Sequence, residues 1–187
     1  MNEPDRTDLA VPVSENDHWR GAADAPVTLV EYGDYECPYC GSASPFLRGL
    51  QRQFGDGLRV VFRNFPRAEI HPHAQHAAEA AEAAGAQGKF WEMHDYLFAH
   101  QQALEYADLI RYAGDLGLDI DRFARELHDH VYAARVRDDF DSGVRSGVSQ
   151  TPTFFLNGVR QGGVFTVPAL MDSLEMLSRM RPDEPRP

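Results

Sequence analysis

Hydrophobic residues form two short runs near the start of the chain, separated by a segment with helical character. Residues 27–32 and 58–63 are predicted to be buried strands, because each is a short apolar run flanked by turn residues. Residues 37–54 between them are predicted to form a helix that ends at Gly55-Asp56-Gly57. A strand–helix–strand opening of this kind indicates a parallel pair of strands with a right-handed crossover.

The middle of the chain, from residue 71 to about 148, is helical almost throughout. Apolar residues recur at helical spacing in segments 89–100 and 107–116. Segment 73–84 is rich in alanine and glutamate, and further helices are predicted at 119–127 and at 129–143, the last with charged and small residues. A single helix is enough to join two parallel strands. The additional helices therefore predict a helical subdomain inserted into an α/β fold.

Strand character returns near the end of the chain. Residues 153–156 are predicted to be a strand, and Asn157-Gly158 is a strong hairpin turn signal before a return strand at 159–161. A last helix is expected after Gly162-Gly163, with Thr166 as its cap and Pro168 in its first turn. Its core-facing residues would be Leu170, Leu174 and Leu177.

The composition is that of an ordinary globular protein, with 43% hydrophobic and 25% charged residues among 187. The net charge of −11 argues against nucleic-acid binding, which needs a basic face. No apolar stretch approaches the ~20 residues that a membrane helix needs, so no membrane partner is expected. The polar N-terminus shows no signal peptide, which predicts a cytoplasmic protein, or an extracytoplasmic one if a leader has been removed.

The only two cysteines, Cys37 and Cys40, lie where the first predicted strand gives way to the helix. A helix N-terminus carries free N–H groups and about half a positive charge, which stabilise a thiolate. The thiolate is the nucleophile of disulfide exchange, and the two-residue spacing lets Cys40 attack a mixed disulfide formed at Cys37. Pro38 suits the first turn of the helix and favours this redox interpretation over inert cysteines. We expect Cys37, at the helix tip, to be the exposed thiol with the low pKa, and Cys40, a turn inside, to be the buried one.

A metal site is the main alternative for the cysteine pair. Structural zinc needs four ligands, and no second cysteine pair is present. Histidines could complete such a site, but none forms the H-E-x-x-H arrangement, and we expect most of them on solvated faces or at helix caps. We therefore predict no metal. The histidines considered are His71, His73, His76, His94, His100, His128 and His130.

Three segments of the chain are distinctive, namely VEYGDYECPYC at 30–40, FWEMHDYLF at 90–98 and GVSQTPTFFLNG at 147–158. Together they resemble the DsbA-like branch of the thioredoxin superfamily, in the subgroup with a helical insertion. The resemblance covers residues 18 to 178. It implies a thioredoxin-like α/β fold with an inserted all-helical subdomain, divided into a thioredoxin-like domain (18–65 and 148–180), a helical insertion (66–147) and flexible tails (1–17 and 181–187).

The resemblance also implies roles for residues around the cysteines. Thr151-Pro152 would form a cis peptide bond beside Cys37, where the backbone of Thr151 pairs with a substrate strand and Pro152 offers no competing N–H. Pro38 and Tyr39 would complete the substrate-binding surface. Glu31 would be a buried carboxylate with a raised pKa that moves protons to and from Cys40.

Two features predict a weaker oxidant than DsbA itself. Asp34 and Glu36 are expected to be exposed, and their charges would oppose a thiolate at Cys37. Tyr39 stands where DsbA-like oxidants often carry a histidine, so no positive charge lies between the cysteines.

The sequence therefore predicts a thiol–disulfide oxidoreductase that needs no cofactor, acts on protein or peptide disulfides and small thiols such as glutathione, and favours the reductase or isomerase direction. Two alternatives stay open. One is a glutathione-dependent transferase or isomerase on the same fold, although such relatives generally carry a lone serine at the helix start. The other is a non-catalytic redox-sensing module, related to versions of this domain fused to membrane transporters.

Overall fold

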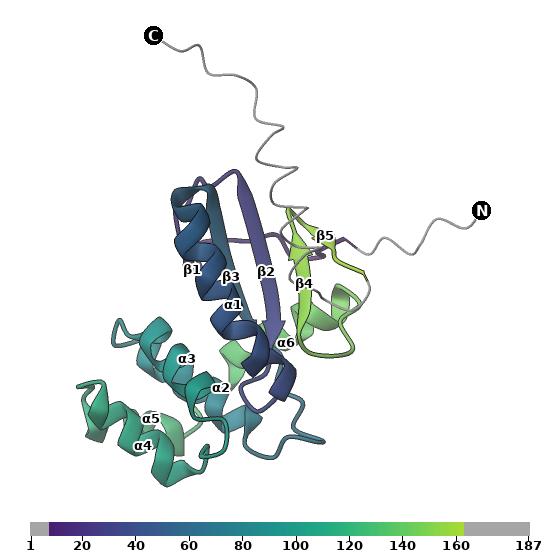
Figure 1. Cartoon of the computed structure of the whole chain (residues 1–187). Helices are drawn as coiled ribbons and strands as arrows, with labels where there is room; N and C mark the ends of the chain where they lie inside the picture. Colours follow the sequence, from purple (N-terminus) through teal and green to yellow (C-terminus); the bar gives the residue numbers. More distant parts are fainter. Residues whose placement is uncertain (1–7, 163–187) are drawn as a thin grey trace, which may run out of the picture.

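The structure is a computed structural model, and it describes residues 8–162. Its centre is a five-stranded sheet with strand order β1-β3-β2-β4-β5 (Figure 1). The strands are β1 (His18–Arg20), β2 (Val27–Gly33), β3 (Leu58–Asn64), β4 (Thr153–Leu156) and β5 (Val159–Arg160). The sequence analysis missed β1, which is short and pairs antiparallel with β3 at the edge of the sheet.

The predicted strand–helix–strand opening is confirmed. Strands β2 and β3 are parallel, and helix α1 (Pro38–Phe54), followed by the 3₁₀ turn η1 (Gly55–Gly57), joins them. Strand β4 pairs antiparallel with β2 and forms the predicted hairpin with β5. Asn157 and Gly158 between them have φ angles of 47° and 83°, as a two-residue hairpin turn requires.

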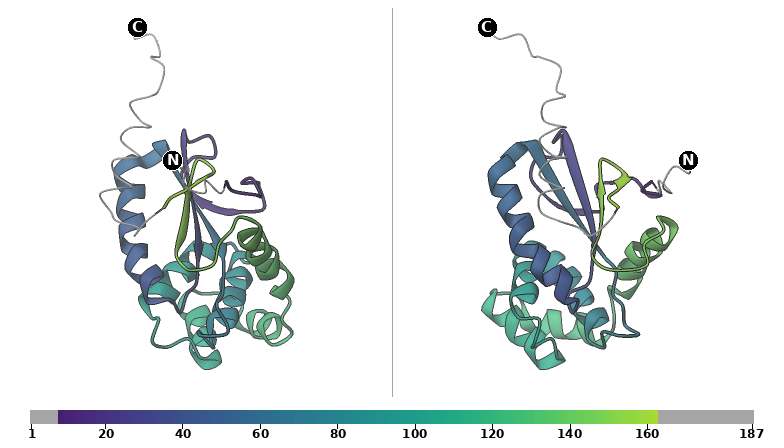
Figure 2. Two further views of the ribbon diagram at one scale, coloured as in Figure 1. Left: turned by 90° about the vertical axis from the view of Figure 1, so that its right-hand side faces the viewer. Right: turned by 45° about the vertical axis from the view of Figure 1, so that its right-hand side comes forward.

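Helices cover both faces of the sheet. Helix α1 packs on one face, where Leu47 and Leu50 meet Leu29 and Val60. The opposite face carries Val30 and Val61, the neighbours of Leu29 and Val60 in sequence, and helix α6 (Ala133–Arg145) packs there through Phe140. Figure 2 (left) shows α1 and α6 on opposite sides of the sheet. The near-continuous burial of β2 and β3 follows from this two-sided cover.

The inserted helices lie beyond the end of β2 at which α1 begins (Figure 1). They are α2 (Ala74–Gly85), α3 (Phe90–Ala99), α4 (Tyr106–Asp115) and α5 (Ile120–His128), close to the predicted ranges. Their hydrophobic cluster includes Tyr35, Cys37, Cys40 and Phe62. The cysteines therefore lie where the sheet, α1 and the insertion meet.

The segment before β1 contacts the sheet from residue 8 onward, within the range 1–17 that was predicted to be a flexible tail. Asp8 forms an isolated β-bridge with Val159. Arg63 of β3 donates to both carboxylate oxygens of Asp17, at 2.7 and 3.0 Å, and to the backbone oxygen of Val11 at 2.9 Å. A buried guanidinium needs such acceptors, and this segment supplies them.

Parts of the predicted organisation lie outside the described residues, namely the helix expected from Thr166 and the tail 181–187. The division into domains 18–65 with 148–180 and 66–147 stays a prediction. Within it, α6 contacts the sheet directly, since Tyr32 and Ser142 share a hydrogen bond of 2.8 Å. Among helices of residues 8–162, none has both the length and the apolar character to cross a membrane.

Candidate active site

Cys37 is the N-cap residue of α1, with extended backbone angles of φ −73° and ψ 119°. Its N–H donates to the backbone oxygen of Asp34 at 3.1 Å, which closes the turn after β2. Its own carbonyl accepts from Gly41 N at 3.1 Å and starts the helix. Pro38 is the first helical residue, where its missing N–H costs nothing. The sequence thus places Cys37 at the tip of α1.

Both cysteines are free thiols, and both are shielded by the protein. The exposed fraction is 4% for Cys37 and 0% for Cys40. We expected a low-pKa thiol at the helix tip to be exposed, so the degree of shielding of Cys37 corrects that expectation. The cause is the helical insertion, whose apolar cluster contains both residues.

The two thiols have opposite pKa shifts. A hydrogen bond from the Cys40 side chain, with further hydrogen bonds from the Thr151 side chain and from the Cys40 and Tyr39 backbone, lowers the pKa of Cys37 to about 5 against the effect of burial. Burial raises the pKa of Cys40 well above its ordinary value, and its hydrogen bond to Cys37 adds to the rise. At neutral pH the pair therefore consists of a thiolate at Cys37 and a thiol at Cys40.

The predicted cis peptide bond between Thr151 and Pro152 is confirmed. The Cys37 sulfur lies 3.4 Å from the backbone oxygen of Thr151. The loop before β4 is therefore next to the reactive sulfur, although the two residues are 114 positions apart in the sequence. Pro38 and Tyr39 lie at the surface beside it, and Tyr39 is 76% exposed. The structure therefore brings together the residues that the resemblance groups around Cys37.

Glu31 lies on β2 beneath the start of α1 and is 2% exposed. Burial raises the pKa of its carboxyl from an ordinary value of 4.5 to about 8, and the charge on Cys37 adds to the rise. Its Oε1 has no hydrogen-bond partner among the described residues. The predicted buried position and raised pKa are confirmed. Such a carboxyl can accept or release a proton near neutral pH.

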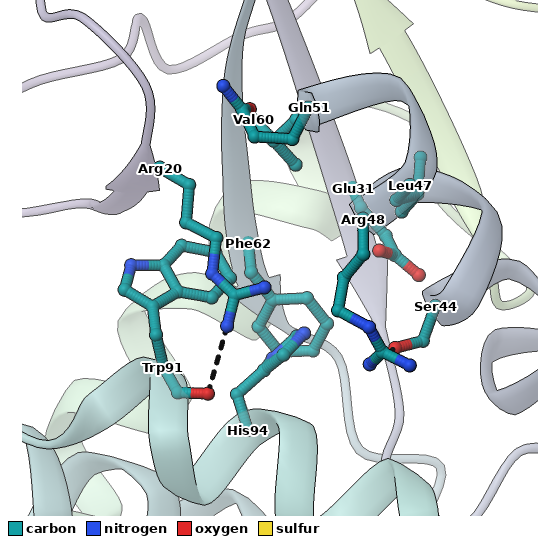
Figure 3. Close-up of a pocket in the computed structure, with 10 residues that line it drawn as sticks. All are labelled: Arg20, Glu31, Ser44, Leu47, Arg48, Gln51, Val60, Phe62, Trp91 and His94. Atoms are coloured by element: carbon teal, nitrogen blue, oxygen red, sulfur yellow. Dashed lines mark hydrogen bonds between the residues drawn. The ribbon is translucent and has the colours of Figure 1, made fainter. Parts of the chain in front are cut away.

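The Glu31 carboxyl borders an internal cavity between α1, the sheet and α3 (Figure 3). Ser44 and Arg48 of α1 form one wall, and Trp91 and His94 of α3 form another. Arg48 contacts Ser44 Oγ at 3.1 Å. Leu47, Val60 and Phe62 line the same cavity, so Glu31 borders a small, largely apolar space with a few polar side chains in its walls.

The acidic residues before Cys37 differ from our expectation. Asp34 is buried rather than exposed, and its carboxylate accepts hydrogen bonds from Arg67 N and pairs with His71 Nδ1, each at 2.8 Å. Glu36 is partly buried and pairs with His73 Nδ1 at 2.9 Å. The sequence analysis expected most histidines on solvated faces or at helix caps and assigned none of them a carboxylate partner, so it missed the partners of both carboxylates. These charges are engaged by the loop after β3 and do not stand free beside Cys37.

His94 is also buried, contrary to the expectation of a solvated face. Its Nδ1 shares a 3.1 Å hydrogen bond with the Tyr35 hydroxyl, and burial lowers its pKa well below the ordinary value. Within residues 8–162, no cluster of three or more His, Cys, Asp or Glu side chains is arranged to hold a metal ion. Gln101 is a further residue that the sequence did not indicate, and it contacts the turn before α1.

Comparison with known proteins agrees with this geometry. The family model described as Thioredoxin matches residues 13–174. A thioredoxin-like oxidoreductase from Silicibacter pomeroyi is 26% identical, with a TM-score of 0.78 over 90% of this chain and 95% of that one. BdbD from Bacillus subtilis, at 24% identity, has a TM-score of 0.80 over 90% of this chain and 96% of its own. The predicted thioredoxin-like, DsbA-like fold is confirmed.

Curated relatives are similar over a part of their length only. A protein named Na(+)/H(+) antiporter NhaA 1 from Salinispora arenicola is 51% identical over 96% of this chain, which covers 28% of that protein. The antiporter NhaA of Herminiimonas arsenicoxydans is 46% identical over 88% of this chain and 27% of its own length. The chain thus spans less than a third of these relatives.

Proposed function

The chain belongs to the thioredoxin family, and we propose that it exchanges disulfides with protein substrates through Cys37 and Cys40. The observation that carries the proposal is the placement of Cys37 at the tip of α1 with Cys40 fully buried in the first turn behind it. In this arrangement the pKa of Cys37 is lowered to about 5, and that of Cys40 is raised. A thiolate beside a protonated thiol is the state that begins exchange. An oxidoreductase fold agrees with this chemistry.

In the first step, the Cys37 thiolate attacks one sulfur of a substrate disulfide. The new bond joins Cys37 Sγ to that sulfur, and the second substrate sulfur leaves as a thiolate. The helix N-terminus and the hydrogen bonds at Cys37 favour this step because they hold the nucleophile deprotonated.

In the second step, Cys40 resolves the mixed disulfide. Its thiol transfers a proton to the Glu31 carboxylate, and the resulting thiolate attacks Cys37 Sγ. A Cys37–Cys40 disulfide forms, the remaining substrate sulfur leaves as a thiolate, and two electrons have passed to the substrate. The charge on Cys37 contributes to the raised pKa of Glu31, and a mixed disulfide at Cys37 carries no such charge. The carboxyl therefore ionises more readily at this stage and can accept the proton of Cys40.

The substrate would lie across the surface formed by Pro38, Tyr39, Thr151 and Pro152. The Thr151 carbonyl lies 3.4 Å from the Cys37 sulfur, close enough for a strand attached to the reacting sulfur to pair with this backbone. The exposed Tyr39 ring offers an apolar contact next to it. Protein or peptide disulfides fit this arrangement. Small thiols such as glutathione would react at the Cys37 sulfur without pairing with the Thr151 backbone.

The proposed direction is reduction or isomerisation. The pKa of Cys37, about 5, lies between the pKa values of the nucleophilic cysteines of DsbA, about 3.5, and thioredoxin, about 7. Since a more stable thiolate makes a more oxidising couple, the potential should lie between about −120 mV and about −270 mV. A glutathione pool near −220 mV or lower would then keep much of the protein as the dithiol.

Turnover of a protein disulfide tests this proposal. With a chemical reductant as electron source, the wild type should reduce insulin, Cys37→Ala should be inactive, and Cys40→Ala should accumulate a mixed disulfide visible by mass. Turnover that survives Cys37→Ala would refute the proposed centre. Activity with glutathione that is independent of Cys40 would instead support a transferase or isomerase.

A redox-sensing module is the second candidate, and the similarity to proteins named antiporters supports it. In that case the same cysteines would change redox state without turning over protein substrates. A wild-type protein that equilibrates with glutathione but fails to reduce insulin would favour the sensor over the enzyme.

A further inference from the structure

Gln101 connects the helical insertion to the turn that carries Cys37. It lies between α3 and α4, and its Nε2 donates to the backbone oxygens of Tyr35 and Cys37, each at 2.8 Å. These acceptors lie on either side of residue 36, immediately before α1. We infer that Gln101 is a positioning residue that sets the stability of the Cys37 thiolate. The inference rests on the proposed function.

The Cys37 carbonyl is the point through which Gln101 acts. Besides Gln101, it accepts from Gly41 N at 3.1 Å, the bond that begins α1. A carbonyl oxygen has two acceptor positions, and both are used here. The direction of this carbonyl fixes the peptide plane at the helix start and hence the first turn. The backbone N–H groups of Tyr39 and Cys40 in that turn are among the groups that lower the pKa of Cys37.

The Tyr35 carbonyl fixes the other side of the turn. Tyr35 is buried in the cluster that contains the cysteines, and its ring packs against Phe62 and Phe98. A buried carbonyl needs a donor, and Gln101 supplies one from the insertion. The Gln101 amide therefore holds the turn relative to two structural units at once, the end of β2 and the start of α1.

Gly41 provides a second, independent observation. A Cβ atom at this position would collide with the Gln101 amide, first with its Oε1 and next with its Cδ, which would lie 2.5 Å away. Glycine is a poor helix former, yet it occupies the first turns of α1 directly after Cys40. The close approach of Gln101 explains this glycine. A larger residue would push the flexible amide aside and remove its nitrogen from both carbonyls.

The test replaces Gln101 by methionine, which keeps the length of the side chain and removes both donors. We expect the pKa of Cys37 in Gln101→Met, measured by thiolate absorbance, to rise by about half a unit to one unit, a three- to tenfold change. The potential against glutathione should become more negative by about 15 to 30 mV, which is the same change converted for a two-electron couple. Gln102→Met, at the exposed neighbouring position, is the matched control and should change neither quantity.

A double-mutant cycle with Gly41 gives the sharper result and does not depend on one variant folding well. Gly41→Ala should raise the pKa of Cys37 and lower the thermal midpoint in the wild type, because it displaces Gln101. In Gln101→Ala it should leave the pKa unchanged and raise the midpoint, because alanine favours a helix. Additive effects, or a folded Gln101→Met with an unchanged pKa and potential, would overturn the inference. Both measurements need no substrate, so a failure of protein-disulfide turnover would count against the proposed function alone.

Discussion

Glu31→Gln should make the protein more stable, and increasingly so as the pH rises. The folded-state pKa of Glu31 is raised from 4.5 to about 8, so between these values the folded protein binds a proton that the unfolded chain does not. A carboxyl with a raised pKa destabilises the fold increasingly as the pH rises above its pKa in the unfolded chain, 4.5. The destabilisation becomes constant once the pH exceeds its pKa in the folded protein, about 8.

The magnitude follows from the difference of about 3.5 units between these two pKa values, at about 1.4 kcal/mol per unit. The cost of ionisation in the wild type is about 1 kcal/mol at pH 5, about 3 kcal/mol at pH 7 and approaches about 5 kcal/mol at pH 9. Glutamine has the same shape and cannot ionise. The difference in free energy of unfolding between the variant and the wild type should therefore grow by about 4 kcal/mol from pH 5 to pH 9.

Urea denaturation of both proteins in the dithiol state at several pH values measures this difference. Glu15→Gln, at an exposed position, is the control and should give a pH-independent difference. The same Glu31→Gln protein should resolve mixed disulfides more slowly, because Cys40 loses its proton acceptor. A stability difference that stays constant from pH 5 to pH 9, or that shrinks, would refute the assignment of a buried, protonated Glu31.

Three further predictions concern other parts of the molecule. After reduction, iodoacetamide at pH 7 should label Cys37 much faster than Cys40, because the pKa of Cys37 is lowered to about 5 while that of Cys40 is raised; equal rates would contradict the assigned roles. Arg63→Met should lower the free energy of unfolding by about 3–5 kcal/mol in urea titrations, since it leaves the Asp17 carboxylate buried without its partner, and a loss below about 1 kcal/mol would contradict this. Tyr39→Ala should change stability by less than about 0.5 kcal/mol, because the side chain is exposed, yet slow reduction of protein disulfides more than that of glutathione disulfide; equal slowing would exclude Tyr39 from the substrate surface.

Much of the fold could be predicted because its signals are local. The apolar runs of β2 and β3, the hairpin turn at Asn157-Gly158 and the helical spacing of α2 to α5 are each contained in a few consecutive residues. Strand β1 was missed because three residues carry too little pattern. Its place is decided by pairing with β3 and by the Trp91 indole, which donates to the Trp19 carbonyl at 2.9 Å.

The sequence by itself determined the chemistry of the centre: two cysteines at a strand–helix junction, a proline that suits the helix start, and an acidic residue on the strand before them. What surrounds these groups was decided by the tertiary structure. Asp34 and Glu36 seemed free charges in the sequence, but His71 and His73 pair with them from a loop 37 residues away. The physical reason is that pKa values and burial depend on distances between atoms, and only folding brings distant segments within hydrogen-bonding reach.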